Sequence, residues 1–251
     1  MMQQAVDFRD ESDALYELIS DMGEKDMARP TQFKDWTVNN ILAHLHYFNW
    51  LADLSLTDED SFATEYSRLM VLMKENGASM VDATDEILGQ IKGYEILKLW
   101  RGYYPRMSEN FAAANPKGRV KWAGPEMSVR SSSSARLMET WAHAQAIYDD
   151  LGVVREDADR IKNIVVMGIN TFDWTFNNRG EKVPEDPPYV RLEAPSGEVW
   201  EWNTSSDHNR IEGKADQFCQ VVTQTRNIAD TGLKVIGDTA TRWMAVAQCF
   251  A

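Results

Sequence analysis

The sequence predicts an α+β protein in which a helical domain is followed by a smaller α/β domain. Up to about residue 180, apolar residues recur at three- and four-residue steps, which is the spacing of one helix face. After Arg179-Gly180, closely spaced prolines precede short segments in which apolar and polar residues alternate, as is typical of strands. We therefore expect a first domain over residues 1–180 and a second over residues 181–251.

The first domain is expected to consist of helices separated by short polar loops. Residues 8–22 form the first helix, which ends at Gly23, and Thr37 is the expected N-cap of the second, which runs to about Leu54. Pro105 is expected to break or kink the fourth, because proline lacks a backbone N–H and clashes with the preceding turn. The remaining helices are expected over residues 58–76, 85–114, 135–151 and 158–177.

The second domain is expected to combine a small sheet with helices. Residues 189–194 and 199–202 form two strands joined by a turn that contains Gly197, and residues 208–212 form a third short strand. Helices are expected over residues 215–226 and 239–251.

Composition and charge narrow the possible function classes. Over 251 residues the formal net charge is −13, which argues against binding to a nucleic-acid backbone. No run of about 18 or more apolar residues occurs, so no membrane-spanning segment is expected, and no secretion signal is evident. Cys219 and Cys249 offer no disulfide framework. We therefore expect a cytoplasmic protein in reducing surroundings.

The main chemical signal is a carboxylate and an imidazole on the helix that contains residues 138–151. Glu139 and His143 are four residues apart, so they lie one turn apart on the same helix face. Such a pair occurs often by chance, and a metal site needs a third ligand from elsewhere. The alternative is a pair of satisfied interior histidines with a solvated Glu139, and spacing alone does not decide between the two.

The helix after Thr37 is the expected source of the third ligand, because it carries two of the four histidines. His44 is favoured because its face is apolar and should point into a bundle, whereas His46 is expected behind the ligands or at the surface. The His44 face also carries Ile41, Phe48 and Leu51, and the His46 face carries Leu42, Asn49 and Asp53. Two imidazoles and one carboxylate suit Zn²⁺, with Ni²⁺ as second choice, and leave a position for water or substrate.

The segment Ile41-Leu42-Ala43-His44-Leu45 and the later Glu139-x-x-x-His143 together resemble the motifs of the DinB-like superfamily. Within it, they resemble the group of mycothiol-dependent maleylpyruvate isomerases and their uncharacterised relatives. The resemblance covers essentially the whole chain, and its further motifs are Trp36-Thr37-Val38, Gly124-Pro125-Glu126-Met127-Ser128, Glu193-Ala194-Pro195-Ser196-Gly197, Gly213-Lys214-Ala215-Asp216 and Arg242-Trp243-Met244.

This resemblance implies a four-helix DinB-like bundle followed by a small α/β domain similar to the sterol-carrier fold. It also implies that His44, Glu139 and His143 hold a divalent metal. Relatives use that metal to activate a low-molecular-weight thiol, namely mycothiol, bacillithiol or glutathione. The isomerases add the thiolate to a conjugated cis double bond and expel it to leave the trans isomer, whereas other members transfer the thiol.

Three arginines are candidates for binding an anionic substrate. Arg226 corresponds to an arginine that the isomerases use, so the resemblance implies a catalytic role in which it clamps a substrate carboxylate. The alternative for Arg226 is a cation favoured at the C-terminus of its helix. Arg130 and Arg136 flank the metal helix and are further anion partners, or ordinary surface residues.

We therefore expect a metal-dependent enzyme, either a maleylpyruvate isomerase-like protein or a thiol S-transferase that acts on a small unsaturated acid. The alternative is a metal- or small-ligand-binding protein without turnover. Expected partners are a small-molecule substrate and a thiol, without nucleic acid or membrane. A monomer or a homodimer is expected.

Overall fold

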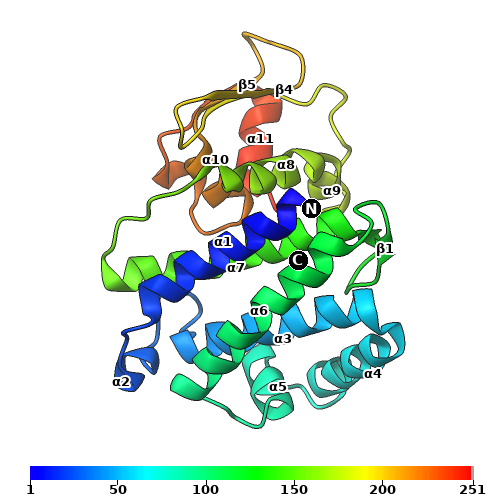
Figure 1. The fold of residues 1–251 in the computed structure, drawn as a ribbon. Coiled ribbons are helices and arrows are strands. Elements are labelled where there is room, and N and C mark those ends of the chain that lie inside the picture. Colours follow the sequence, from blue (N-terminus) through cyan, green and yellow to red (C-terminus); the bar gives the residue numbers. More distant parts are fainter. Residues whose placement is uncertain (250–251) are drawn as a thin grey trace. The chain divides into compact units, whose positions relative to one another are not determined.

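The computed structural model describes residues 1–249 and divides into two compact units, Met1–Val154 and Arg155–Ala251 (Figure 1). Helices make up most of the first unit, and the second combines helices with a small mixed sheet. This arrangement confirms the predicted α+β class. The division lies earlier in the chain than the boundary predicted at residue 180.

The first unit is built around four helices that pack against one another, as the resemblance implies. They are α1 (Gln3–Ile19), α3 (Val38–Thr57), α6 (Tyr94–Ala113) and α7 (Val129–Leu151). Helices α1 and α6 contact each other, α7 packs on both α1 and α3, and α3 packs on α6. Large side chains such as Leu15, Trp100 and Trp141 are fully buried between them.

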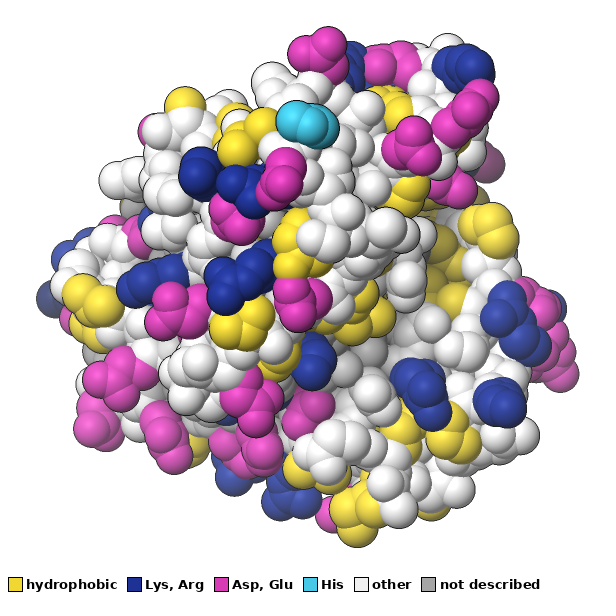
Figure 2. Space-filling model, turned by 90° about the horizontal axis from the view of Figure 1, so that it is seen from above, with side chains coloured by type: hydrophobic (Ala, Val, Ile, Leu, Met, Phe, Trp, Pro, Cys, Tyr) yellow, Lys and Arg dark blue, Asp and Glu magenta, His cyan; other side chains and the backbone are white. Residues whose placement is uncertain are grey.

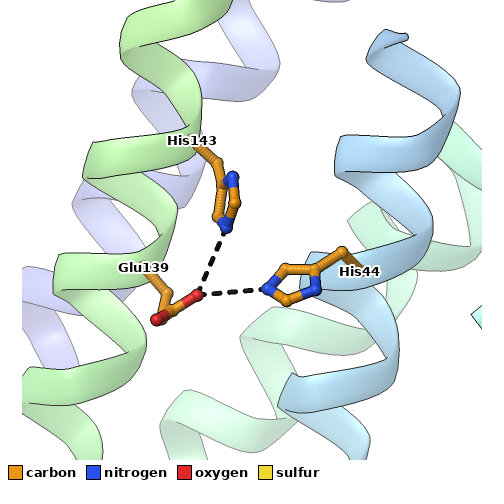
Figure 3. A group of neighbouring side chains, drawn as sticks. All are labelled: His44, Glu139 and His143. Carbon is orange, nitrogen blue, oxygen red and sulfur yellow. Dashed lines mark hydrogen bonds and ion pairs between the residues drawn. The ribbon is translucent and has the colours of Figure 1, made fainter. Parts of the chain in front are cut away.

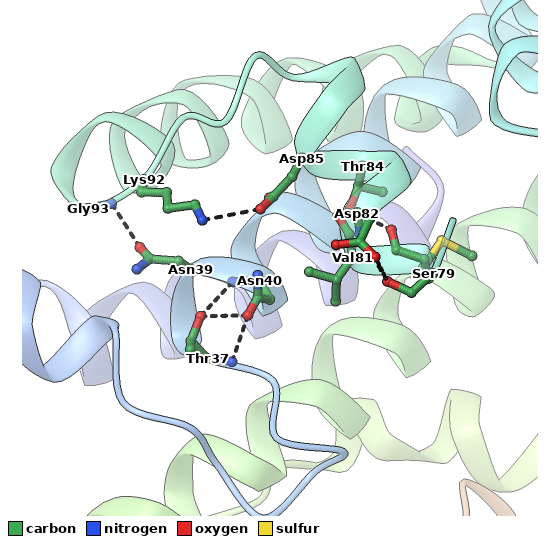
Figure 4. Close-up of polar contacts among 11 residues, drawn as sticks. Thr37, Asn39, Asn40, Ser79, Val81, Asp82, Thr84, Asp85, Lys92 and Gly93 are labelled. Atoms are coloured by element: carbon green, nitrogen blue, oxygen red, sulfur yellow. Dashed lines mark hydrogen bonds and ion pairs between the residues drawn. The ribbon is translucent and has the colours of Figure 1, made fainter. Parts of the chain in front are cut away.

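Helix α3 begins where the sequence predicts. The Asn40 N–H donates to Thr37 Oγ1 at 3.2 Å, and the Thr37 N–H donates to Asn40 Oδ1 at 2.9 Å (Figure 4). This reciprocal capping box satisfies backbone donors that the first helical turn leaves open. The N-cap prediction for Thr37 is therefore confirmed.

Between α3 and α6 the chain forms a satellite layer of short elements. It contains α4 (Glu59–Met70), a π-helical turn (Val71–Glu75) and α5 (Met80–Ile87), while α2 (Glu24–Met27) lies earlier in the chain. Ser79 caps α5 by accepting from the Asp82 N–H at 3.1 Å (Figure 4). Side chains of this layer bury a cluster against α3 that includes Tyr47, Leu51, Phe62, Leu69 and Leu72.

The predicted helix over residues 85–114 is two helices, and its break is not at Pro105. Helix α6 runs through Pro105, whereas Gly89, Gln90 and Gly93 adopt positive φ angles of 72°, 60° and 62° and separate α5 from α6. A Cβ on Gly93 would lie 2.3 Å from Glu24 Oε1. The Gly93 N–H donates to Asn39 Oδ1 at 2.8 Å (Figure 4). The positive φ angles of Gly89, Gln90 and Gly93, and not Pro105, therefore divide the predicted helix into α5 and α6.

Helix α7 starts earlier than predicted. A short antiparallel pair, β1 (Arg119–Val120) with β2 (Met127–Ser128), leads directly into it. Ser128 caps the helix by accepting from the Ser131 N–H at 3.0 Å, so the serine run belongs to its first turns. Gly152 ends the helix with a φ of 63°, as the sequence predicts.

The second unit contains a mixed sheet in the order β4-β3-β5-β6. Its strands are β3 (Tyr189–Glu193), β4 (Val199–Trp202), β5 (Arg210–Lys214) and β6 (Lys234–Ile236). Strand β3 pairs antiparallel with β4 and parallel with β5, and β6 joins β5 antiparallel. The sequence predicted β3, β4 and the segment of β5 but not β6, which is only three residues long.

Helices pack beside one another in this second unit, which explains the early division. They are α8 (Lys162–Asn170), α9 (Phe172–Asn177), α10 (Ala215–Val222) and α11 (Asp238–Val246). The Phe172 and Phe218 rings lie 5.1 and 5.7 Å from that of Trp243, centroid to centroid. Apolar side chains of residues 155–180, such as Phe172, therefore pack against residues of the 181–249 segment. Helix α10 ends four residues before Arg226, and the predicted final helix extends to residues 250 and 251, which lie outside the described residues.

Within the described part of the chain, no helix is long and apolar enough to cross a membrane. Figure 2 shows one face of the molecule, on which acidic and basic side chains lie among one another and apolar side chains are scattered between them.

Candidate metal centre

The structure brings His44, Glu139 and His143 together from two helices (Figure 3). His44 Nε2 lies 3.1 Å from Glu139 Oε2, and His143 Nε2 lies 3.3 Å from the same oxygen. One potential ligand atom from each residue falls within 4.8 Å of the other two. The spacing of Glu139 and His143 on α7 places both on the side that packs against α3, and His44 on α3 faces them.

Three aromatic side chains, Phe33, Trp36 and Phe48, surround the two imidazoles, and we call them the aromatic wall. The Trp36 ring stacks on that of His143 at 5.5 Å with an interplanar angle of 4°, and Phe33 meets His143 edge-on at 5.1 Å. Phe48 lies 4.6 Å from His44, and Trp36 lies 5.3 Å from it. These contacts orient the two imidazoles and leave the His44 and His143 side chains only 11% and 12% exposed.

A tight turn holds Phe33 and Trp36 in place. The Trp36 N–H donates to the Phe33 carbonyl at 2.8 Å, and the Thr31 N–H donates to the Trp36 carbonyl at 2.8 Å. Between them, Lys34 and Asp35 both have positive φ angles, 51° and 59°. Two successive left-handed residues other than glycine are uncommon, and strained backbone of this kind is concentrated at functional sites. The sequence prediction placed Phe48 on the His44 face but did not assign Phe33 or Trp36 to the site. The available signal for those two was a pair of aromatic residues in the loop directly before the histidine helix.

The protonation states of the centre suit a metal ion. Burial lowers the pKa of His44 to about 4, against the hydrogen bond with Glu139, which raises it. Burial raises the pKa of Glu139, but hydrogen bonds with His143 and His44 outweigh it and hold that pKa well below its usual range. At neutral pH, His44 is therefore a neutral imidazole and Glu139 an ionised carboxylate, which are the forms that bind metals.

The donor set fits a borderline divalent ion. Two imidazole nitrogens and a carboxylate oxygen are ligands typical of catalytic zinc sites, and atoms bound to a tetrahedral zinc ion lie about 3.3 Å apart. The measured separations of 3.1 and 3.3 Å to Glu139 Oε2 agree with that value. His44, Glu139 and His143 therefore fit Zn²⁺, and the same donors also accept Ni²⁺.

His46 does not belong to this group, and the expectation that it lies behind the ligands or at the surface is wrong. Its side chain is buried against α6, where its ring meets Tyr103 edge-on at 5.3 Å. About two turns further on, Asp53 accepts from Tyr103 Oη at 2.9 Å and from Asn110 Nδ2 at 2.8 Å. The polar face of α3 is therefore an internal contact with α6, which the sequence of α3 alone does not reveal.

The three candidate arginines lie in different surroundings. Arg226 belongs to the second unit, where Nη1 donates to the Thr225 carbonyl at 2.8 Å and the side chain lines a cavity of about 290 Å³. Its catalytic role stays a prediction. Arg130 is exposed, whereas Arg136 is buried, and its Nε donates to Asn49 Oδ1 at 2.9 Å. The expected surface role of Arg136 is therefore wrong.

Comparison with known proteins connects this centre to a family. Residues 8–148 match the family model described as the mycothiol maleylpyruvate isomerase N-terminal domain. Uncharacterised proteins from two strains of Mycobacterium tuberculosis, CDC 1551 and H37Rv, are 36% identical over 245 residues, which cover 98% of this chain and 94% of theirs.

A solved structure has the same fold. The crystal structure of the mycothiol-dependent maleylpyruvate isomerase aligns with a TM-score of 0.55 and 14% sequence identity, and the alignment covers 87% of each chain. The family match contains all three residues of the metal centre, from His44 to His143. The chain therefore belongs to the family defined by the mycothiol maleylpyruvate isomerase N-terminal domain.

Proposed function

We propose that this chain is a metal-dependent enzyme that uses a low-molecular-weight thiol to isomerise a small cis-unsaturated acid similar to maleylpyruvate. The observation that carries the proposal is the convergence of His44, Glu139 and His143 within 4.8 Å in a chain of this family. Mycothiol is the first choice among the three expected thiols, because the family description and the matching crystal structure both name it.

In the first unit, one group of residues would bind the metal ion and another would limit the access of water to it. His44, Glu139 and His143 would hold Zn²⁺ or Ni²⁺. A bound ion of this kind supplies a Lewis acid that lowers the pKa of a thiol, so that the thiolate is available near neutral pH. Glu139 stays ionised and offers negative charge rather than a proton. The aromatic wall limits water at the imidazoles and so favours attack by the thiol over hydration.

The proposed reaction consumes no atoms. The thiolate sulfur adds to one carbon of the cis double bond, and the electron pair of that bond moves onto the conjugated carbonyl as an enolate. The former double bond is now single and rotates. The enolate then re-forms the double bond in the trans geometry and expels the thiolate. An enolate requires nearby positive charge. The carboxylate-clamping role that the resemblance implies for Arg226 remains a prediction.

Metal content and thermal shift with thiols test this proposal. Purified protein is expected to carry or take up one zinc or nickel ion per chain, and mycothiol is expected to raise its melting temperature more than bacillithiol or glutathione. A protein that binds no ion contradicts the proposal. An ion without any response to the three thiols favours the alternative of a metal-binding protein without turnover.

Product analysis distinguishes an isomerase from a thiol S-transferase. Maleylpyruvate is incubated with metal-loaded protein and mycothiol, and the products are followed by NMR. The trans isomer with unchanged mycothiol supports the isomerase, whereas a stable thioether adduct favours the S-transferase. A Glu139→Ala variant should show neither product.

A further inference from the structure

Arg136 and Asn49 form a buried pair with two unsatisfied donors. Arg136 is 7% exposed and Asn49 is fully buried, and Arg136 Nε donates to Asn49 Oδ1 at 2.9 Å. Among the described residues, neither Arg136 Nη2 nor Asn49 Nδ2 has a hydrogen-bond partner, although both atoms are shielded from solvent. The Asn49 amide orientation is fixed by the bond that its oxygen accepts. The pair therefore holds one N–H-bearing atom on each side chain that is buried and has no acceptor.

An arrangement of this kind is costly unless something completes it. Burial lowers the pKa of Arg136 to about 10, so the guanidinium remains charged at neutral pH. Buried polar donors in native proteins are nearly always satisfied, and a buried charge without a partner is destabilising. Arginine and asparagine N–H groups are suitable donors to the two oxygens of a carboxylate.

The pair lies beside the metal centre. Arg136 precedes Glu139 by three residues on α7, so their side chains are neighbours about 5–6 Å apart at Cβ. Their charges interact, and Arg136 also acts electrostatically on His44. The guanidinium lies over the Phe48 ring at 5.9 Å from its centroid, and the same ring lies 4.6 Å from His44. Phe48 therefore contacts both the His44 ring and the Arg136 guanidinium.

Charge balance indicates the kind of ligand. With a divalent ion bound, the positive charges of the ion and Arg136 exceed the single negative charge of Glu139 by two. A thiolate supplies one of the missing negative charges, and a second anion is needed. The helical spacing separates the centre from Arg136 by about one turn, roughly 5 Å along the axis. A short unsaturated acid spans that distance.

We infer that Arg136 and Asn49 bind the carboxylate of the small acid substrate and place its double bond next to the metal centre. This inference rests on the proposed function, because the substrate class comes from it. It assigns substrate recognition within the first unit to a residue on the same helix as two of the metal ligands.

Maleate and its neutral counterpart maleamide test the inference by calorimetric titration into zinc-loaded and EDTA-treated protein. Wild type should bind maleate and bind maleamide at least about tenfold more weakly, because charge-assisted hydrogen bonds are lost. Arg136→Gln should weaken maleate binding by about 10- to 100-fold and leave zinc content unchanged. The matched control is Arg130→Gln on the same helix, which should bind maleate as wild type does.

A second variant covers the case in which Arg136→Gln does not fold. The double variant Asn49→Leu with Arg136→Met removes both partners together, so neither is left unpaired, and such replacements are tolerated better than single ones. It should keep its zinc and lose maleate binding. The inference is overturned if wild type binds maleate no better than maleamide, or if Arg136→Gln binds maleate as wild type does. It is also overturned if Arg136→Gln abolishes the thermal shift by mycothiol while maleate binding persists. Failure of the proposed function shows separately, as absent zinc or absent thiol response in wild type.

Discussion

Helix α3 carries two buried histidines, two residues apart, in contrasting surroundings. His44 meets a carboxylate and an imidazole from α7 inside the aromatic wall. His46 meets Tyr103 of α6, next to a closed hydrogen-bond network in which Asp53 accepts from Tyr103 and Asn110. Burial and a lowered pKa are common to both histidines. What distinguishes a metal site is therefore the convergence of donors from a second helix.

Removal of a metal ligand should give the largest of the expected effects, a loss of zinc affinity that His46 substitutions do not share. His44→Ala or Glu139→Ala leaves two donors, and zinc affinity should fall by at least about 10³-fold, beyond the 10–100-fold typical of outer residues. That loss corresponds to about 4 kcal/mol. Competition with a chromogenic chelator measures it. His46→Phe keeps an aromatic edge against Tyr103 and should retain wild-type affinity, so loss of zinc in that variant would erase the distinction between the two histidines.

Asp53→Ala should affect stability rather than metal binding. The substitution leaves the Tyr103 hydroxyl and the Asn110 amide without their acceptor, and the free energy of unfolding should fall by about 3 kcal/mol. Urea denaturation of the zinc-free protein measures this change. Asp53→Asn keeps one acceptor oxygen and should lose less. A zinc affinity that falls along with stability would mean that the two faces of α3 act as one site.

The Trp36→Ala substitution tests whether the aromatic wall contributes to zinc affinity at His44 and His143. The indole stacks on His143 and tilts against His44, so its removal admits water and loosens both rings. Zinc affinity should fall by about tenfold, at the low end of the effects of outer residues. The matched control is Trp50→Ala, a half-buried tryptophan of α3 that packs on Tyr47 in the satellite cluster. Equal losses in both variants would show a general weakening of α3 and not a specific wall.

Thr37→Ala should give the smallest effect. It removes the side-chain acceptor of the α3 capping box and should lower the free energy of unfolding by about 1 kcal/mol. Zinc affinity should remain within about threefold of wild type, because His44 lies two turns into the helix. Thermal denaturation with and without zinc measures both quantities. An equal destabilisation by Thr57→Ala, whose hydroxyl bonds at the other end of α3, would show that the cap has no special role.

Local signals in the sequence accounted for the start of α3, the end of α7 and the ligand pair on α7. Thr37 and Gly152 mark helix ends because capping depends on a few adjacent residues. The spacing of Glu139 and His143 fixes their common face whatever surrounds the helix, and the apolar row of His44 indicated the bundle side of α3.

Features that depend on distant residues were not predictable in the same way. The burial of His46 comes from Tyr103, and that of Arg136 comes from packing of α7 against Asn49 of α3. Residues 158–177 have a helical pattern that does not indicate which unit they pack in, and the two units divide before the predicted boundary at residue 180. Pro105 shows the converse, since a strong local rule was overridden within α6.

The turn at Lys34 and Asp35 is less constrained by the rest of the fold than the helices that carry the metal-ligand donors. The donors lie on long helices that pack against the rest of the bundle. Phe33 and Trp36, in contrast, are positioned by a short turn with left-handed backbone at Lys34 and Asp35. Lengthening or reshaping that turn would alter the enclosure of the two imidazoles without moving the helices that carry His44, Glu139 and His143. On the side of Phe33 and Trp36, the enclosure of the two imidazoles therefore depends on a few loop residues and not on the helices that carry the donors.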